Sequence, residues 1–329
     1  MDWGLITGDA LRALVGSEAV VFALAAIGLN VHFGYTGLLN FGQAGFLAVA
    51  AYGLATTVTI FGLPFWLGIV VGFAGVIVLA LLLGIPTLRL RADYLAIVTI
   101  AAAEILRLIF RSVTLRDTFG GSNGISGFSN DFYALNPYTD DVGFEPFVFS
   151  SRNGWVLTVG WVLVVIACLI VWALMRSPWG RVIKAIREDE DAVRSLGKNV
   201  YYYKMQSLII GGLLGALGGF VFALAQAAVQ PDLYSPNLTF FAYTILILGG
   251  AARVLGPVVG SMIFWCLLQL TAGTLEGLVR TGAIPTWLMD SNDVGAVRFM
   301  LVGVALLLLL VYRPQGIFGD RKEIALDAR

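Results

Sequence analysis

Few residues of this sequence have both the type and the spacing to do chemistry, and those few lie inside long apolar runs. Glu104 is followed by Arg107 and Arg111, three and seven positions later, on one face of an expected helix. Ionisable groups inside an apolar helix are costly and usually face a cavity or the interior of a bundle. Glu104 could therefore pair with Arg107 or meet a zwitterionic ligand, and the sequence leaves both readings open.

A glycine-rich interruption at residues 34–45 carries the amides of Asn40 and Gln43. Such a break could turn backbone dipoles toward a ligand, as transporter sites do. Its glycines could instead let neighbouring helices pack closely. Gln226 is a lone amide near the end of another apolar run, where an interhelical hydrogen bond is the ordinary role. We take Asn40, Gln43, Glu104 and Gln226 as candidates for a substrate path.

No arrangement of residues typical of an enzyme is present. The sequence has no Ser/His/Asp set, paired carboxylates or CxxC pair, and its one histidine, His32, lacks metal partners at ligand spacing and is predicted to lie at a membrane interface. Cys168 and Cys266 lie in apolar runs, where a thiol behaves as a small hydrophobe. A GxxxxGK[ST] phosphate loop is also absent, so we expect no cofactor on this chain and no ATP binding by that device.

The composition is that of a membrane protein. Of the 329 residues, 58% are hydrophobic and only 13% charged, and the mean hydropathy of +0.86 lies far above that of soluble domains. The apolar runs leave no polar block large enough for a second domain, so residues 1–329 are predicted to form one membrane domain in contact with lipid. The net charge of zero gives no indication of a nucleic-acid partner.

The apolar runs predict an all-α polytopic bundle. A helix needs about 20 apolar residues to cross a bilayer, and the runs lack the alternation of barrel strands. We expect about nine membrane helices, within a range of eight to ten, of which the seventh and eighth are short. They are Glu18–His32, Gln43–Ile60, Phe65–Ile85, Tyr94–Phe110, Trp155–Met175, Ser207–Val229, Phe240–Leu248, Pro257–Leu270 and Val297–Tyr312.

Basic residues in the connections predict the orientation. Residues 176–204 carry seven lysines and arginines, whereas residues 112–153 carry two, so the first segment is expected in the cytoplasm and the second outside. Counting helices from there puts the N-terminus outside and the C-terminus in the cytoplasm, with Arg280 and Arg298 as modest exceptions. The N-terminus lacks the features of a cleaved signal peptide and is expected to be retained.

The basic segment, residues 176–204, has its own helix signals. Ser177 can cap a helix that starts at Pro178, and Gly197 can end one in the left-handed conformation. Two short amphipathic helices are predicted, with an apolar side made of Val182, Ile183, Ile186, Val193 and Leu196. The segment could be a solvated connector at the lipid interface. The acidic cluster at residues 188–191 argues against simple adhesion to anionic lipid.

A family resemblance becomes specific at this segment. The stretch RSPWGRVIKAIREDEDAVRSLGKNVYYYK resembles the cytoplasmic coupling loop of ABC importer permeases, closest to the M-type membrane subunit of branched-chain amino acid importers. Further stretches that resemble the family, in the family's order, are GYTGLLNFGQAGFLAVAAYG, LRLRADYLAIVTIAAAEILRLIF, GGSNGISG, ILGGAARVLGPVVGS and YRPQGIFG. They are distributed over nearly the whole chain.

The resemblance implies a permease fold with a cytoplasmic coupling helix, in a bacterial inner membrane. It implies that residues of this segment dock on an ATPase subunit, namely Arg187, Glu188, Asp189, Ala192 and Gly197. The implied partners are a second homologous permease, two ATP-binding cassette subunits that hold ATP and Mg, and an extracytoplasmic solute-binding protein, received at residues 112–153. The implied cargo is a branched-chain or related amino acid.

Two alternatives stay open. Permeases for urea or short-chain amides look similar within the same class. From a different class, the chain could be a stand-alone channel or an ion-coupled carrier, which would work without ATPase partners and would give Glu104 a role in ion coupling.

Overall fold

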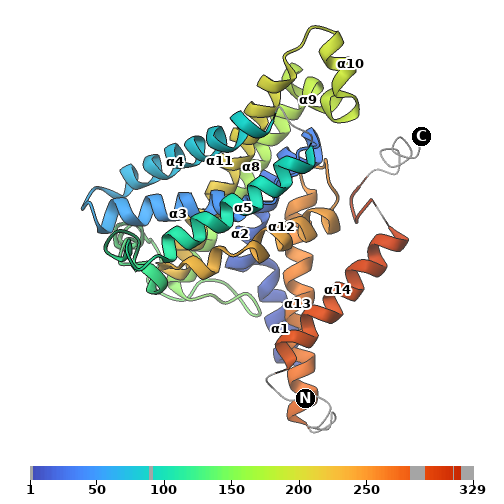
Figure 1. Ribbon diagram of the computed structural model, residues 1–329. Helices are drawn as coiled ribbons and strands as arrows, with labels where there is room; N and C mark the ends of the chain where they lie inside the picture. The colour runs from blue at the N-terminus through green and yellow to red at the C-terminus, as the bar shows by residue number, and fades with distance from the viewer. Residues whose placement is uncertain (1–2, 89–91, 282–292, 314, 320–329) are drawn as a thin grey trace.

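The computed structural model describes residues 3–88, 92–281, 293–313 and 315–319, and this part of the chain is mostly helical (Figure 1). The long helices are α1 (Trp3–Val15), α2 (Ser17–Leu29), α3 (Gln43–Thr59), α4 (Phe65–Thr87), α5 (Ala92–Arg111), α8 (Ser151–Arg176), α11 (Val200–Gln226), α12 (Pro236–Gly249), α13 (Gly256–Arg280) and α14 (Val294–Tyr312). A π-helical turn, η1 (Asn30–Tyr35), continues α2.

All nine predicted helices coincide with helices in the described residues. Five helical stretches there are long and apolar enough to cross a membrane on their own: Trp3–Tyr35, Phe65–Thr87, Ser151–Arg176, Val200–Gln226 and Gly256–Arg280. The remaining predicted helices are shorter or carry more charge, so nine crossings stay a prediction. The long runs of apolar residues explain helix formation, because lipid offers no hydrogen bonds and a helix pairs its backbone N–H and C=O groups within its own segment.

The prediction that α13 is short was wrong. The helix does not end at Leu270 but continues for ten more residues to Arg280. The polar residues Thr271 and Thr274 do not interrupt it, because each hydroxyl donates to the carbonyl oxygen four residues earlier, at 2.9 Å. The sequence therefore becomes more polar without the helix ending.

Helix α1 was not predicted. It precedes the first apolar run and lacks a wide apolar stripe, and Ala10 is its one buried residue. Contacts far along the chain hold it: Ile6 packs on Gly273 of α13, and Arg12 donates to the carbonyl oxygen of Pro146 at 2.5 Å. Tertiary contacts thus stabilise a helix that its own pattern does not indicate.

The core is built around α2, where each residue from Ala19 to Leu29 is buried. Helix α11 packs directly against α2 and α3 through glycines. A methyl group at Gly28 would overlap the carbonyl oxygen of Gly211, and one at Gly219 would overlap that of Leu47. Close packing through small residues of this kind is typical of membrane helices.

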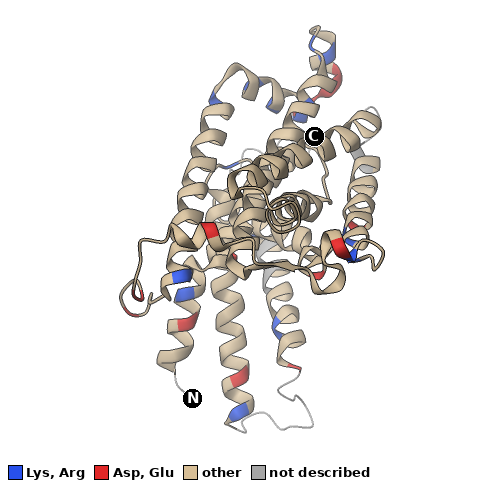
Figure 2. Cartoon of the chain, turned by 90° about the vertical axis from the view of Figure 1, so that its left-hand side faces the viewer, with Lys and Arg blue, Asp and Glu red and all other residues tan. Residues whose placement is uncertain are grey.

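The two ends of the bundle differ. Helices α9 (Pro178–Glu188) and α10 (Glu190–Ser195) project at one end, and the N-terminus and residues 112–150 lie toward the other, which we call the distal end (Figure 1). Charged residues gather at α9 and α10 and toward the distal end, and the helix bodies between them are nearly free of charge (Figure 2).

The turn between α12 and α13 and residues 315–319 belong to the α9 end. The backbone of Ile317 and Phe318 donates to the carbonyl oxygens of Leu248 and Gly249. This arrangement agrees with the predicted grouping of segments, but which end faces the cytoplasm stays a prediction. Four further basic residues that the predicted topology places in the cytoplasm lie outside the described residues: Arg89, Arg91, Arg321 and Lys322.

The distal connection after α5 is ordered. It forms α6 (Arg116–Phe119), η2 (Gly121–Asn123), β1 (Ile125–Ser126) and α7 (Asn130–Ala134). Strand β1 pairs antiparallel with β2 (Ala228–Val229), which leads into η3 (Pro231–Tyr234). The Tyr133 hydroxyl donates to the carbonyl oxygen of Leu224 at 2.7 Å, and partial burial raises the pKa of Tyr133. These bonds attach the connection to the end of α11.

Candidate functional site

The segment between α8 and α11 folds as two short helices, as predicted. The Ser177 hydroxyl accepts from the backbone of Gly180 at 3.4 Å, and Pro178 occupies the first helical position of α9. Gly197 follows α10 with φ of +76°, a left-handed conformation that favours glycine. The chain then enters α11 after Asn199, whose side chain accepts from the backbone of Tyr202 at 3.2 Å.

A small apolar cluster fixes this segment against α11. Ile186, Val193 and Val200 are buried together, and Ile183 joins the main core. Leu196, which was predicted to share that side, is instead 79% exposed. It follows the last residue of α10, where the chain turns away through Gly197, so the helical spacing no longer applies to it.

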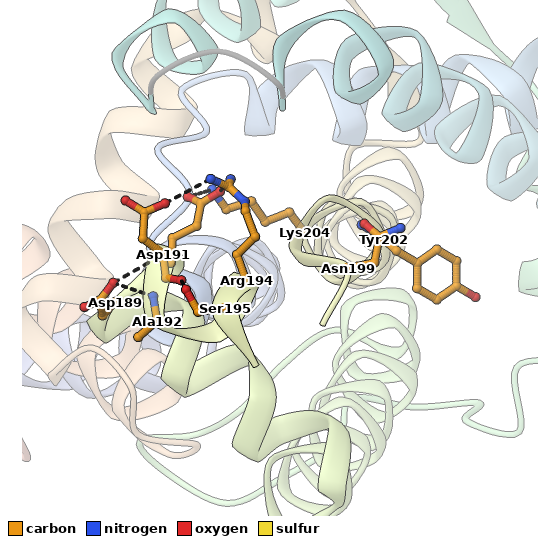
Figure 3. Close-up of polar contacts among 9 residues, drawn as sticks. Asp189, Asp191, Ala192, Arg194, Ser195, Asn199, Tyr202 and Lys204 are labelled. Carbon is orange, nitrogen blue, oxygen red and sulfur yellow. Dashed lines mark hydrogen bonds and ion pairs between the residues drawn. The ribbon is translucent and has the colours of Figure 1, made fainter. Parts of the chain in front are cut away.

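Most of the acidic residues of the segment are engaged within it (Figure 3). The Asp189 carboxylate caps α10 by accepting from the backbone of Asp191 and Ala192, both at 3.0 Å. Arg194 pairs with Glu190 and Asp191 at 2.9 Å each, and Lys204 of α11 also pairs with Glu190. The pairs of the exposed Arg194 give the segment a defined shape more than stability, because exposed pairs contribute about 0–1 kcal/mol each.

The five predicted docking residues lie on this projection. Glu188, Asp189, Ala192 and Gly197 are exposed, and a side chain added at Gly197 would meet nothing within 4 Å. Arg187 is also exposed, but its guanidinium Nη1 donates to the carbonyl oxygen of Gly34 at 2.5 Å. Arg187 therefore connects α9 to η1.

The π-helical turn η1 joins several parts of the bundle. Asn30 donates to the carbonyl oxygen of Arg253 and accepts from the backbone of Ala252, both at 2.8 Å. His32 lies 3.0 Å from the carbonyl oxygen of Leu208 through Nε2. Contacts thus run from α9 through η1 to the α12–α13 turn and to α11. Single π-turns inside helices are frequent at functional sites.

The prediction of an interfacial His32 was wrong, because its side chain is fully buried. The absence of a side chain at Gly211 makes room for the imidazole, which a methyl group there would overlap. The sequence pattern gives no sign of this pairing, since the two residues are far apart in the chain.

Asn40 and Gln43 are fully buried and lie together in the break between η1 and α3. The Asn40 amide is 3.2 Å from Gln43 Oε1 and 3.1 Å from His32 Nδ1. Backbone N–H groups of the break donate to Thr99 of α5 and Thr239 of α12, at 3.0 and 2.9 Å. The polar groups of the break thus have their hydrogen-bond partners within the protein.

Glu104 and Gln226 lie elsewhere, so the four candidates for a substrate path do not form one site. The anticipated pair is present: the Arg107 guanidinium binds both carboxylate oxygens of Glu104, at 2.6 and 2.9 Å. Gln226 is exposed at the end of α11. Sequence reasoning missed Asp232 of η3, which lies 2.7 Å from Arg107. An acidic residue in a polar turn gives no sign of its distant partner.

The described residues contain no group of three or more His, Cys, Asp and Glu side chains placed to hold a metal ion. The geometry therefore offers an exposed projection, a hydrogen-bonded connection into the bundle and a charged face on α5. None of these activates a nucleophile or moves a proton to a substrate.

Comparison with known proteins agrees with this geometry. The chain matches the family described as branched-chain amino acid transport system, permease component, over residues 14–311. It is 31% identical to the high-affinity branched-chain amino acid transport system permease protein LivM of Salmonella typhimurium, over 92% of this chain and 69% of that protein. It is 26% identical to the probable branched-chain amino acid transport permease protein LivM of Methanocaldococcus jannaschii, over 92% of both. The nucleoside ABC transporter permease protein NupC of Lactococcus lactis is 24% identical over 74% of this chain and 76% of that protein.

Proposed function

Because the chain belongs to the family of branched-chain amino acid transport system permease components, we propose that it forms part of the membrane path of an ATP-driven importer for branched-chain or related amino acids. As an ABC permease it is a multi-pass membrane protein and not an enzyme. ATP and Mg belong to two partner ATPase subunits, and a second homologous permease completes the path. An extracytoplasmic binding protein delivers the substrate to the distal end.

The observation that carries the proposal is the projecting pair of helices α9 and α10, which contacts η1 through the Arg187 hydrogen bond and through Lys184, whose ammonium lies over the Tyr35 ring. In the proposed arrangement Glu188, Asp189, Ala192 and Gly197 contact an ATPase subunit in the cytoplasm. A displacement of α9 reaches η1 through the bond from Arg187, and the bundle through the contacts of η1. Discrete contacts of this kind can carry a two-state change from one site to another.

The four candidate residues divide by role in this proposal. Asn40 and Gln43 keep the break after η1 in shape, since their amides are already bonded within the protein. Glu104 lies on the path, and Gln226 lies exposed near its distal mouth. The N-terminus would then be outside the inner membrane and the C-terminus in the cytoplasm.

The function is tested by reconstituting the chain with its partner subunits in proteoliposomes. Radiolabelled leucine, urea, a short-chain amide and a nucleoside are offered with the binding protein, with and without ATP. We expect leucine uptake that depends on ATP. Preference for urea, amide or nucleoside would reassign the substrate, and uptake by this chain alone would indicate a channel or carrier.

The coupling role is tested with Gly197→Trp and Glu188→Lys. Gly62→Trp is the matched control, because Gly62 has φ of +62° and also has open space around its Cβ position, but lies between α3 and α4. We expect both segment variants to lose transport and substrate-stimulated ATP hydrolysis, and the control to keep both. Unchanged activity in both segment variants would refute the docking assignment.

A further inference from the structure

A cluster of four charged side chains lies where α5 meets η3. It consists of Glu104, Arg107 and Arg111 of α5 and Asp232 of η3, and we call it the α5 charge cluster. Arg107 bridges the two acids, 2.6 Å from Glu104 Oε1 and 2.7 Å from Asp232 Oδ1. Arg111 adds a weaker contact of 3.3 Å to the same Asp232 oxygen. The cluster thus has two positive and two negative groups.

The cluster is closed on one side and open on the other. The Arg107 side chain is 15% exposed, but those of Glu104, Arg111 and Asp232 are 36%, 49% and 58% exposed. Arg111 uses one nitrogen for its ion pair, and its other N–H groups are not used in that pair. The cluster can therefore bind a ligand while its internal ion pairs stay in place.

The extent of the cluster along α5 argues against lipid as the neighbour of this face. Glu104 lies about 10 Å from Arg111 along α5, at 1.5 Å per residue, so the cluster covers roughly a third of the hydrocarbon thickness of about 30 Å if α5 spans the membrane. Charged groups within a membrane span usually face a water-filled path or another protein chain. Beside them runs an exposed apolar stripe formed by Tyr94, Ile97, Ile105 and Leu108. A charged stripe next to an apolar one suits a ligand with a polar end and an apolar end.

The layer beneath the cluster has unsatisfied polar groups. Within the described residues, the hydroxyls of Tyr52, Thr56 and Tyr234 are buried and lack a hydrogen-bond partner. Tyr234 is two residues from Asp232, and Tyr52 stacks at 4.0 Å on Phe110, the neighbour of Arg111. Buried hydroxyls without hydrogen-bond partners are unfavourable. A polar ligand group that reaches them and forms a hydrogen bond would therefore lower the free energy of this layer.

From these observations we propose that the α5 charge cluster recognises the main-chain end of a zwitterionic α-amino acid on its way through the permease. Arg111 binds the carboxylate, Asp232 and Glu104 bind the ammonium group, and the apolar stripe faces the side chain. The inference rests on the proposed function and adds the residues that select for paired charges. Urea and neutral amides cannot make this double contact.

The test measures access and protection of a cysteine beside the cluster in the assembled importer. In a background of Cys168→Ala and Cys266→Ala, Leu108→Cys is treated with a charged, water-soluble thiol reagent. Leu169→Cys is the matched control, because Leu169 is similarly exposed but lies on the apolar surface of α8. We expect fast labelling at position 108 and slow labelling at 169. Equally slow labelling at both would overturn the proposal.

Protection then tests recognition of the two charges. Leucine should slow labelling at position 108, whereas 4-methylpentanoate and isoamylamine, which each lack one charge, should not. Losing one charge-assisted contact should weaken protection about tenfold in Arg111→Gln and in Asp232→Asn. Arg111→Lys keeps the charge and should keep most of the protection, which separates recognition from a fault in folding. Equal protection by all three compounds would overturn the proposal.

Leucine uptake by the unmodified importer separates the two hypotheses. If leucine is transported but Arg111→Gln and Asp232→Asn leave uptake and protection unchanged, the cluster is not a recognition site and the proposed function stands. If the importer moves a neutral substrate and not leucine, the proposed function fails and this inference fails with it.

Discussion

At the scale of single residues, Arg187 combines an exposed position with one long-range bond. Replacement by Gln removes the charged donor to the carbonyl oxygen of Gly34. We expect uptake per ATP hydrolysed to fall several-fold, while the free energy of unfolding falls by about 1–3 kcal/mol because the bond is part-buried and its acceptor loses a charged donor. Arg181→Gln on the same helix is the control. Equal coupling ratios in the two variants would speak against a transmitting bond.

Gly211 is a residue whose missing side chain is itself structural. In Gly211→Ala the methyl group overlaps the His32 ring, and overpacking of this kind costs about 1–3 kcal/mol. Gly295→Ala in α14 meets open space and should be neutral or slightly stabilising. Thermal unfolding of both variants in detergent checks the difference. A Gly211→Ala protein as stable as the Gly295→Ala protein would mean that α2 and α11 are less tightly packed than described.

At the scale of elements, α10 depends on its cap. Asp189→Ala removes the acceptor for two backbone N–H groups and should cost about 1 kcal/mol of local stability, whereas Asp189→Asn keeps an acceptor. We expect faster tryptic cleavage after Arg194 in the Ala variant only. Equally fast cleavage in both variants would show that the negative charge, and not the cap, supports α10.

Sequence predicted the elements better than their contacts. Length and apolar character located nine helices, and the signals at Ser177 and Gly197 located the ends of the projecting segment. The continuation of α13 and the exposure of Leu196 were missed, because each depends on local hydrogen bonding or chain direction that the pattern does not contain. Composition reflects the average hydropathy of a helix and not its hydrogen bonds or its end.

The candidate site was predictable only where its parts are close in sequence. The pair of Glu104 with Arg107 follows from spacing along one helix face. The contact of Arg107 with Asp232 and the burial of His32 need the fold, because they join residues more than 100 positions apart. A single sequence holds no information on such pairs beyond residue type.

At the scale of the whole molecule, the orientation of the bundle can be measured directly. In a background without Cys168 and Cys266, single cysteines replace Asp141 in the distal connection and Lys184 in α9. An impermeant maleimide applied to intact spheroplasts should label position 141 and not position 184, because basic segments stay in the cytoplasm. After lysis both should react. The reverse pattern would invert the proposed topology.

The burial of α2 from Ala19 to Leu29 has a consequence for biosynthesis. Its polar continuation through Asn30, His32 and Asn40 is shielded in part by α11, which the ribosome makes long after α2. The His32 imidazole lacks its partner on Leu208 until α11 enters the membrane, and the Asn30 side chain lacks its partners Ala252 and Arg253 until the later turn between α12 and α13 is made. Lipid cannot supply these hydrogen bonds. We therefore expect the newborn chain to keep its first span sheltered at the insertion machinery until α11 and the turn between α12 and α13 are made, and chains truncated before α11 should be substrates for membrane quality-control proteases.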